Sequence, residues 1–443
     1  MLTSCQTTRY VATELTDTAT QSQETETETA SATADSDTQS DTASVDTESD
    51  TESDTTSESS SATDIETDSS TADSSSATDS VSTDDSATQT AETDTPIDSE
   101  SDSGADTDSD TEPDSESDTD TFCDLPTSFE WAASPAPLIT PLPGDIAIKD
   151  PTVVFYDGEW HIYATAKPAA NQWGLDYVHF ADWADVASAE KVHASDNPRL
   201  QGYKAAPQLF QFSLDDKWYL IYQSPIPAFS TNAHPGNVNG WSEKQNLLFD
   251  LPSINGNSIS GIDYWVICDD DTCYLFFSGT DGDVHHLYRT STPKSMFPNG
   301  FQYDQIDVIL QAQLPSGNDL LDASNVYKIL GRNEYLLLVS ALDDNGFRYF
   351  RAFRTENLGG DWAPWADTEM NAFASPYNVS GADWALDGVN HGEMLRANND
   401  ESMTINTCHL RYVFQGKTVS GIDYEHNEYS LGMLTDTRDT GKK

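Results

Sequence analysis

Three aspartates stand just before strand-like segments of this sequence, where carboxylates could do chemistry together. Asp150, Asp263 and Asp322 each precede a predicted hairpin turn by six to nine residues, so we expect them at equivalent positions of repeated units. Crowded carboxylates shift one another's pKa values apart. Hydrolysis of a glycosidic bond needs one protonated and one ionised carboxyl, and a third can tune the acid. The same three side chains could instead form a structural calcium site.

A histidine occupies the corresponding place in a fifth unit. His391 begins the sequence His391-Gly392-Glu393, directly before an apolar segment. A single histidine is commonly a structural residue with its hydrogen bonds satisfied. In a channel lined by carboxylates it could instead ligate an ion or hold a water molecule.

The elements that position these residues are predicted to be β-hairpins. From Phe122 onward, an apolar run repeatedly leads to a turn of Asp, Gly or Asn and then to a second run that ends in aromatic residues. Such alternation of apolar runs with turn residues indicates antiparallel strands. The five turns are expected at 157–158, 215–216, 269–271, 331–333 and 398–400.

The spacing of these turns leaves room for two further strands after each hairpin. Strands are visible in two of those places, at 285–289 and 348–353. Units of four strands at a regular period are typical of propeller blades. We therefore predict an all-β, five-bladed β-propeller over 123–436, followed by a C-terminal tail at 437–443. A β-sandwich with irregular loops is the alternative on this pattern alone.

The first 122 residues have a different composition. They contain 34 acidic residues against one basic residue, Arg9, and no aromatic residue between Val11 and Thr121. Such a chain cannot bury enough apolar surface to offset its conformational entropy. We predict a long, disordered, acidic Ser/Thr-rich stalk that like charges keep extended. Calcium buffering by its carboxylates and glycosylation of its hydroxyls remain open.

Charge and hydropathy restrict the partners. The formal net charge of −55 argues against binding to nucleic acid or to an anionic membrane, both of which need a basic surface. No run approaches 18 apolar residues, so no membrane span is expected. The segment Leu2-Thr3-Ser4-Cys5 resembles a bacterial lipobox, and a lipidated Cys5 would anchor the stalk at the cell surface. Chance similarity over four residues is the alternative.

The cysteines favour an oxidising, extracellular location. Cys268 and Cys273 flank the third turn, so a disulfide across that hairpin is expected. Cys123 and Cys408 remain at the two ends of the domain, and a bond between them would latch the ring closed. No Cys-x-x-Cys pair exists, so a cysteine metal site is not expected.

A series of short segments occurs in fixed order through the aromatic-rich part of the chain. They are 123–126, 149–150, 181–185, 206–207, 228–230, 239–242, 262–263, 348–351, 358–362, 391–393, 414–416 and 432–435. This series resembles glycoside hydrolase family 62, the α-L-arabinofuranosidases that trim arabinose from xylan. The resemblance covers about 123–436 and implies a five-bladed propeller with a terminal disulfide.

The resemblance also implies roles for single residues. Asp150 matches the general base, Asp263 the residue that tunes the acid, and Asp322 the general acid. His391 matches a histidine near an axial calcium ion, so a structural Ca²⁺ is expected. The residues implied to contact substrate are Lys149, Gln223, Tyr264, Arg351, Tyr424 and Tyr429.

Several positions depart from the family pattern. Asp322 stands where the family has Glu and is one methylene shorter, which could draw the proton away from the leaving oxygen. Ser224-Pro225 replaces Trp-Gly in a pocket wall. Tyr264 replaces a Gln, and Ser430 replaces an Arg near the substrate surface. These changes bear on substrate choice and activity rather than on the fold.

Taken together, these features predict a secreted, monomeric, inverting glycoside hydrolase. Its substrate would be a plant cell-wall polysaccharide, arabinoxylan or arabinan, from which it would release α-L-arabinofuranosyl side chains. Two alternatives remain. One is a non-catalytic glycan-binding propeller, and the other is a related propeller glycosidase that acts on another pentose or linkage.

Overall fold

The computed structural model describes residues 122–438 except 251–252, 255–256, 282–283, 315 and 420–422. The predicted stalk up to residue 121, including Cys5, lies outside the described residues, as does the end of the chain after residue 438. Within the described part, no helix combines the length and the apolar character needed to cross a bilayer.

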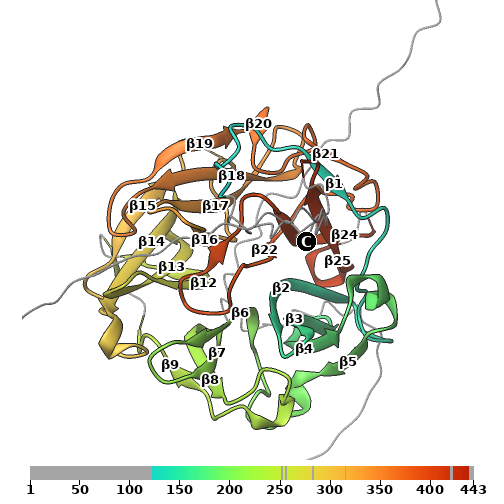
Figure 1. Cartoon of the computed structure of the whole chain (residues 1–443), viewed down its shortest axis with the longest axis horizontal. Helices are drawn as coiled ribbons and strands as arrows, with labels where there is room; N and C mark the ends of the chain where they lie inside the picture. Colours follow the sequence, from blue (N-terminus) through green and yellow to red (C-terminus); the bar gives the residue numbers. More distant parts are fainter. Residues whose placement is uncertain are drawn as a thin grey trace, which may run out of the picture. The chain divides into compact units, whose positions relative to one another are not determined.

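Five sheets surround a central axis, as predicted for a five-bladed propeller (Figure 1). In blades one to three, the first strand lies nearest the axis and the later strands lie progressively outward. Blade one contains β2 (Ala147–Tyr156), β3 (Glu159–Ala169), β4 (Gln172–Phe180) and β5 (Glu190–His193). Blade two contains β6 (Ala205–Phe212), β7 (Lys217–Ser224), β8 (Ile226–Asn232) and β9 (Gln245–Asn246). Blade three contains β12 (Ser260–Cys268), β13 (Thr272–Asp281), β14 (Val284–Pro293) and β15 (Asp307–Gln311).

The last two blades carry additional short strands. Blade four contains β16 (Asn325–Ile329), β17 (Tyr335–Leu342), β18 (Arg348–Thr355), β19 (Ala363–Thr368), β20 (Asn371–Ala372) and β23 (Thr404–Ile405). Blade five contains β22 (Gly392–Met394), β24 (Arg411–Lys417), β25 (Tyr429–Asp436), β1 (Trp131–Ala133) and β21 (Val379–Ser380).

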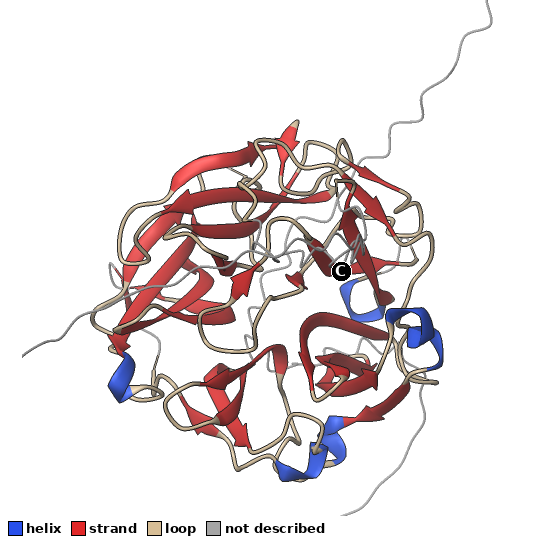
Figure 2. Cartoon of the chain, viewed as in Figure 1, coloured by secondary structure: helices blue, strands red, loops and turns tan. Residues whose placement is uncertain are grey.

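Outside the blades, the described elements are short. Strands dominate the domain, and its helices are single 3₁₀ turns or little more (Figure 2). They are η1 (Trp183–Ser188), η2 (Ala194–Asp196), η3 (Val238–Gly240), η4 (Lys294–Met296) and η5 (Tyr424–His426), beside the small hairpin of β10 (Ser253–Ile254) and β11 (Asn257–Ser258).

Four of the five predicted hairpins are confirmed. The pairs are β2 with β3, β6 with β7, β12 with β13, and β16 with β17. Three of these four turns contain left-handed residues: Asp157 (φ 52°) and Gly158 (φ 84°) in the first, Asp216 (φ 55°) in the second and Gly331 (φ 73°) in the fourth. Asp and Gly accept this conformation more readily than other residues, which explains why these turns were visible in the sequence. The further strands predicted at 285–289 and 348–353 are also present, as parts of β14 and β18.

The fifth predicted hairpin is wrong. β22 pairs with β24, whereas β23 joins blade four as a parallel neighbour of β16. The connection between β22 and β23 contacts blade two through Arg396. This residue pairs with Glu393 of β22 at 2.8 Å and donates to the carbonyl of Leu209, in β6 of blade two, at 2.6 Å. A buried arginine with these partners holds the segment away from its own sheet.

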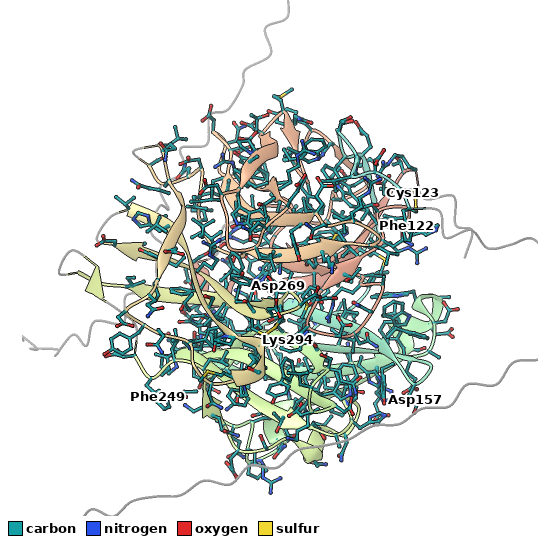
Figure 3. All side chains as sticks on the ribbon, turned by 60° about the vertical axis from the view of Figure 1, so that its left-hand side comes forward. Phe122, Cys123, Asp157, Phe249, Asp269 and Lys294 are labelled. Atoms are coloured by element: carbon teal, nitrogen blue, oxygen red, sulfur yellow. A yellow bond between two sulfur atoms is a disulfide. The ribbon has the colours of Figure 1, made fainter. Side chains whose placement is uncertain are left out.

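The ring is closed by the N-terminal segment. β1 pairs with β25, so the outer part of blade five comes from the opposite end of the domain. The predicted disulfide Cys123–Cys408 is confirmed, and Cys123 lies beside Phe122 at the edge of the domain (Figure 3). The predicted disulfide Cys268–Cys273 joins a cross-strand pair of the β12–β13 hairpin.

Hydrogen bonds between neighbouring first strands fix the blades relative to one another. The amide of Gln208 donates to the Val266 carbonyl and accepts from the Val266 N–H, each at 2.7 Å. The Leu209 N–H of β6 donates to Thr152 Oγ1 of β2 at 2.9 Å. Buried polar groups that are satisfied across blades restrict the first strands to one relative placement. They therefore hold the axial ends of these strands, where the site residues lie.

Candidate active site

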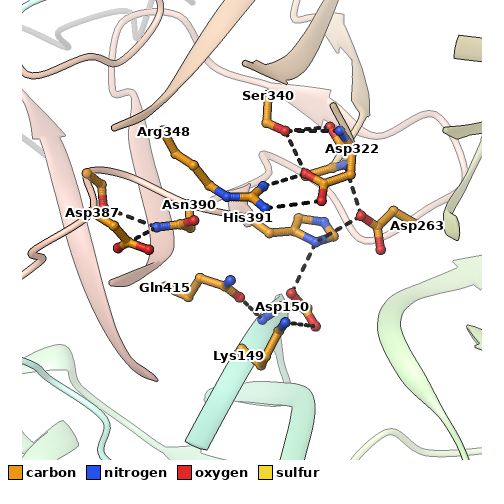
Figure 4. Close-up of polar contacts among 12 residues, drawn as sticks. Lys149, Asp150, Asp263, Asp322, Ser340, Arg348, Asp387, Asn390, His391 and Gln415 are labelled. Atoms are coloured by element: carbon orange, nitrogen blue, oxygen red, sulfur yellow. Dashed lines mark hydrogen bonds and ion pairs between the residues drawn. The ribbon is translucent and has the colours of Figure 1, made fainter. Parts of the chain in front are cut away.

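Side chains from three blades meet at the axis around one histidine. His391 Nδ1 lies 3.3 Å from Asp150 Oδ1 and 3.8 Å from Asp263 Oδ2 (Figure 4). The backbone N–H of Asp150 donates to Gln415 Oε1 at 2.6 Å. Blade one thus contributes Asp150, blade three Asp263, and blade five both His391 and Gln415.

Backbone irregularities aim the aspartates at the axis. Asp150 and Asp263 have φ values of 48° and 55°, and each sits in a break of the strand register between the first and second strands of its blade. Ala206 occupies the same position in blade two, at φ 46°. Left-handed backbone in a residue other than glycine costs free energy and is concentrated at functional sites. The bulge turns the side chain out of the alternating pattern of the strand.

The expected equivalence of all three aspartates is wrong for Asp322. In blade four the left-handed residue is Ala323, at φ 53°, and Asp322 comes one residue earlier. Asp322 accepts a backbone hydrogen bond from the Ser340 N–H at 3.1 Å and comes directly before the left-handed residue, so it corresponds to Lys149 and Ile262. Its carboxylate therefore enters the site from a different backbone position.

Asp322 is held by a forked ion pair. Arg348 Nη1 lies 2.5 Å from Asp322 Oδ1 and Nη2 lies 3.3 Å from Oδ2, while Ser340 Oγ donates to Oδ1 at 2.7 Å. Burial alone would raise the pKa of Asp322, but Arg348 and then Ser340 outweigh burial and hold that pKa well below its usual range. Asp322 is therefore a carboxylate in this arrangement.

Asp263 has the opposite tendency. Burial raises the pKa of Asp263 to about 6, and the charges of Asp322 and Asp150 add to it, against the lowering effects of His391 and of the Ala323 N–H. That N–H donates to Asp263 Oδ2 at 2.9 Å. The expectation that Asp263 keeps the pKa of Asp322 high is thus reversed. Arg348 keeps Asp322 ionised, and the Asp322 charge helps to keep a proton on Asp263.

Asp150 is ionised by its cationic neighbours. Burial would raise the pKa of Asp150, but Lys149, with its Nζ 3.9 Å from Asp150 Oδ2, and His391 lower it overall. Burial would lower the pKa of His391, but Asp263, Asp150 and Asp322 raise it. The site therefore contains an ionised carboxylate on blade one and a carboxyl that retains a proton at weakly acidic pH on blade three.

Three residues implied to contact substrate lie around this cluster. Lys149 Nζ lies 5.5 Å from the centre of the Tyr429 ring, and the Tyr429 hydroxyl donates to Asp387 Oδ2 at 3.3 Å. Gln223 Oε1 accepts from the Asp263 N–H at 3.4 Å. Lys149, Gln223 and Tyr429 thus form part of the surroundings of the carboxylates.

The other implied substrate residues have different positions. Tyr264 is 2% exposed, and its hydroxyl donates to the Gly261 carbonyl at 2.9 Å. Arg351 donates to the carbonyls of Asp319 at 2.5 Å and Asp367 at 2.8 Å, so it is bound to its own blade rather than to the carboxylate cluster. The side chain of Tyr424 lies outside the described residues.

Sequence reasoning missed Arg348, which is the arginine of β18 that reaches the cluster. Arg348 and Arg351 are three residues apart in one strand, so they point to opposite faces of the sheet. That alternation was the available signal that only one of the two arginines could face Asp322.

Sequence reasoning also missed Asp387. Its backbone carbonyl accepts from the Arg348 N–H at 2.8 Å, and its Oδ1 accepts from Asn390 Nδ2 at 3.0 Å.

Three buried oxygen atoms without a hydrogen-bond partner belong to residues that neighbour His391 or Asp322 in the sequence, and they are candidate ligands for the expected calcium ion. Asn390 Oδ1, Ser324 Oγ and Asn325 Oδ1 are buried and make no hydrogen bond. Asn390 precedes His391, and Ser324 and Asn325 directly follow the Asp322–Ala323 segment. Unsatisfied buried oxygens are costly unless a cation or water supplies the missing interaction, and calcium prefers oxygen ligands and bound water.

The fold and the axial carboxylates define a propeller glycoside hydrolase domain. Residues 130–435 match the model of glycosyl hydrolase family 62, and the chain belongs to this family. It is 41% identical over 316 residues to alpha-L-arabinofuranosidase C of Cellvibrio japonicus, covering 70% of this chain and 48% of that protein. The chain thus spans about half the length of this curated relative.

Solved structures of the family share the architecture. The catalytic domain of a GH62 alpha-L-arabinofuranosidase from Coprinopsis cinerea matches with a TM-score of 0.65 and 40% identity, over 71% of this chain and 98% of that one. The Podospora anserina alpha-L-arabinofuranosidase in complex with cellotriose matches with a TM-score of 0.64 and 34% identity, over 70% and 98% of the two chains. A GH62 hydrolase in complex with xylotriose matches with a TM-score of 0.64 and 32% identity, over 70% and 98%.

Proposed function

We propose that this domain is an inverting α-L-arabinofuranosidase that removes arabinofuranosyl side chains from arabinoxylan or arabinan. The observation that carries the proposal is the set of carboxylates gathered around His391 inside a family 62 propeller. The complexes of two similar structures with cellotriose and xylotriose support a surface that accepts a β-linked polysaccharide chain.

Asp150 acts as the general base in this proposal. Lys149 and His391 favour its ionised form, so it is able to take a proton from the attacking water near neutral pH. A base must be ionised before the reaction, and Asp150 meets that condition. In an inverting enzyme the base and the acid lie on opposite faces of the sugar, with room for one water beside the base.

Asp322 acts as the general acid, and Arg348 must release it first. The forked pair keeps Asp322 ionised, whereas an acid must carry a proton to the leaving oxygen. We propose that bound sugar takes over hydrogen bonds of Arg348, so that the pKa of Asp322 rises in the complex. Asp263, with its pKa of about 6, is the second candidate for the acid.

A calcium ion at the axis would have a structural role. His391 and the unsatisfied oxygens of Asn390, Ser324 and Asn325 are the groups that would hold it and its water. Removal of calcium by a chelator should then lower the melting temperature of the protein, and a chelator without effect on melting would contradict this role.

We further propose that the protein is exported, monomeric and held at the cell surface by a lipidated Cys5. The two disulfides support an oxidising compartment. Mass spectrometry of the N-terminal peptide from a membrane fraction tests this, because acylation adds a defined mass to Cys5.

A glycan-binding propeller without hydrolytic activity is the second candidate function. The ion pair of Arg348 with Asp322 favours it, since an acid that never gains its proton cannot assist the leaving group.

Chromatography of sugars released from wheat arabinoxylan, branched arabinan and unsubstituted xylan separates the two candidates. The hydrolase should release free arabinose from the branched polymers and lose that activity in Asp150→Asn. Retention of the polymers without any release of sugar would support the binding module instead.

A further inference from the structure

A second group of charged side chains lies in blade one, apart from the carboxylates around His391. It consists of Asp145 before β2, Asp176 in β4 and His193 at the end of β5. Each offers one donor atom, and these atoms all lie within 4.8 Å of one another. Among the described residues, no other group of three such side chains meets that distance.

The backbone fixes two of these side chains next to each other. Asp176 and His193 are directly opposite in the β4–β5 pair, so their side chains share one face of the sheet. His193 Nδ1 lies 2.8 Å from Asp176 Oδ1. Asp145 approaches from the preceding loop, with its Oδ2 3.7 Å from the same nitrogen.

The carboxylates of Asp145 and Asp176 each have one oxygen without a hydrogen-bond partner. The Asp176 side chain is 1% exposed, and its Oδ2 is buried without a hydrogen bond. The Asp145 side chain is 8% exposed, and its Oδ2 also has no hydrogen-bond partner. Two desolvated carboxylates beside a single imidazole are unfavourable unless a further positive charge offsets them. The nearby Lys191 is partly occupied elsewhere, because its Nζ donates to the Thr140 carbonyl at 2.8 Å.

The donor set suits a tetrahedral transition-metal ion. Zinc binds histidine nitrogen and carboxylate oxygen at about 2.0–2.2 Å, which places neighbouring donors about 3.4 Å apart. The two distances from His193 Nδ1, 2.8 Å and 3.7 Å, lie on either side of that value. Calcium is a poorer fit, since it takes six or more oxygen ligands. The 36% exposure of the His193 side chain leaves a path for the ion to enter.

We propose that Asp145, Asp176 and His193 bind a zinc-like divalent cation, with water as the fourth ligand. Binding displaces the proton shared between His193 and Asp176 to solvent. The ion ties the outer strand β5 to the loop that leads into β2, five residues before Asp150. Its role is therefore structural support of the strand that presents the proposed base.

Calorimetric titration of the full chain with ZnCl₂ tests the site, after removal of metals and with calcium present in excess. We expect one tight zinc ion per chain and a rise in melting temperature on binding. His193→Gln removes a ligand at a partly exposed position and should weaken zinc binding by at least about tenfold. Asp145→Asn should have a similar effect.

His179→Gln is the matched control. His179 lies in β4, three residues after Asp176, and like His193 it faces two carboxylates, with Nδ1 3.3 Å from Glu159 and Nε2 3.8 Å from Glu190, but it is not part of the group. This variant should bind zinc as tightly as the unmodified chain. Weak zinc binding by exposed carboxylates should be the same in all the variants, so it does not affect the comparison. Unchanged affinity in His193→Gln, or loss of the tight site in His179→Gln, would overturn the assignment.

Discussion

Arg348 and Asp322 form a forked ion pair across blade four, with the two closest atoms 2.5 Å apart. Their side chains are 23% and 21% exposed, so the pair is only partly screened by water. The residue assigned as the general acid is thus bound to a permanent cation. Removal or displacement of Arg348 should change both the stability of the fold and the proton affinity of the site.

Substitution of Arg348 by methionine should destabilise the fold in a pH-dependent manner. The depressed pKa of Asp322 contributes stability that is fully present above the unfolded pKa of about 4 and is lost as the pH falls from there through the depressed folded value. Arg348→Met should therefore lower the free energy of unfolding by about 2–3 kcal/mol at pH 7, and by clearly less at about pH 2.5. Urea denaturation at the two pH values measures this. Equal losses at both would show that the charge of Arg348 is not the cause.

Substitution of Asp263 by asparagine should have the opposite pH dependence. A raised carboxyl pKa contributes stability below the unfolded value of about 4, and this is lost as the pH rises through about 6. Asp263→Asn should thus be more stable than the unmodified chain by about 1–3 kcal/mol at pH 7 and nearly equal to it at pH 4. Denaturant melts of both proteins across this range provide the comparison. A variant destabilised throughout would contradict the assigned pKa.

The identity of the general acid can be read from leaving-group dependence. An aryl arabinofuranoside with a good leaving group needs little protonation, whereas a polysaccharide needs it fully. Asp322→Asn should lose about 10²–10⁴-fold in kcat/KM on arabinoxylan and much less on the aryl substrate. Asp150→Asn should lose activity on both. If Asp263→Asn shows the selective loss instead, Asp263 is the acid.

The two disulfides should differ in their effect on stability. Cys123–Cys408 closes a separation of 285 residues and joins the N-terminal segment to the last blade, whereas Cys268–Cys273 closes five residues. Replacement of the first pair by serine should cost about 2–5 kcal/mol, and replacement of the second should cost less. Thermal melts of the two double variants test the order. A larger loss for the short loop would contradict the role of the first bond as a latch.

The parts of the fold that follow from local chemistry could be predicted from the sequence. Turns such as Asp157-Gly158 carry their signal in the residues that adopt left-handed backbone. The closure of blade five by β1 and the transfer of β23 to blade four could not be read, since both depend on pairing between distant segments. The buried pair of Arg396 and Glu393 accounts for the transfer of β23 to blade four, but this role becomes visible only when the arrangement of the blades is known.

The candidate site also has some residues that could be predicted from the sequence and others that could not. Asp150 and Asp263 were found because both precede similar turns, and the structure brings both to His391. Asp322 was found for the same reason, but its position one residue before the bulge is invisible without the register of the strands. Arg348 reaches Asp322, whereas Arg351, the arginine expected to contact substrate, donates to carbonyls of its own blade, since the two residues point to opposite faces of β18.

The most direct test of the account is the configuration of the first sugar released, followed by proton NMR during hydrolysis of arabinoxylan. Attack by a water that Asp150 activates, on the face opposite the leaving group, inverts the anomeric carbon. The account predicts that β-arabinofuranose appears first and that Asp150→Asn releases none. An initial α anomer, or release that persists in Asp150→Asn, would contradict it.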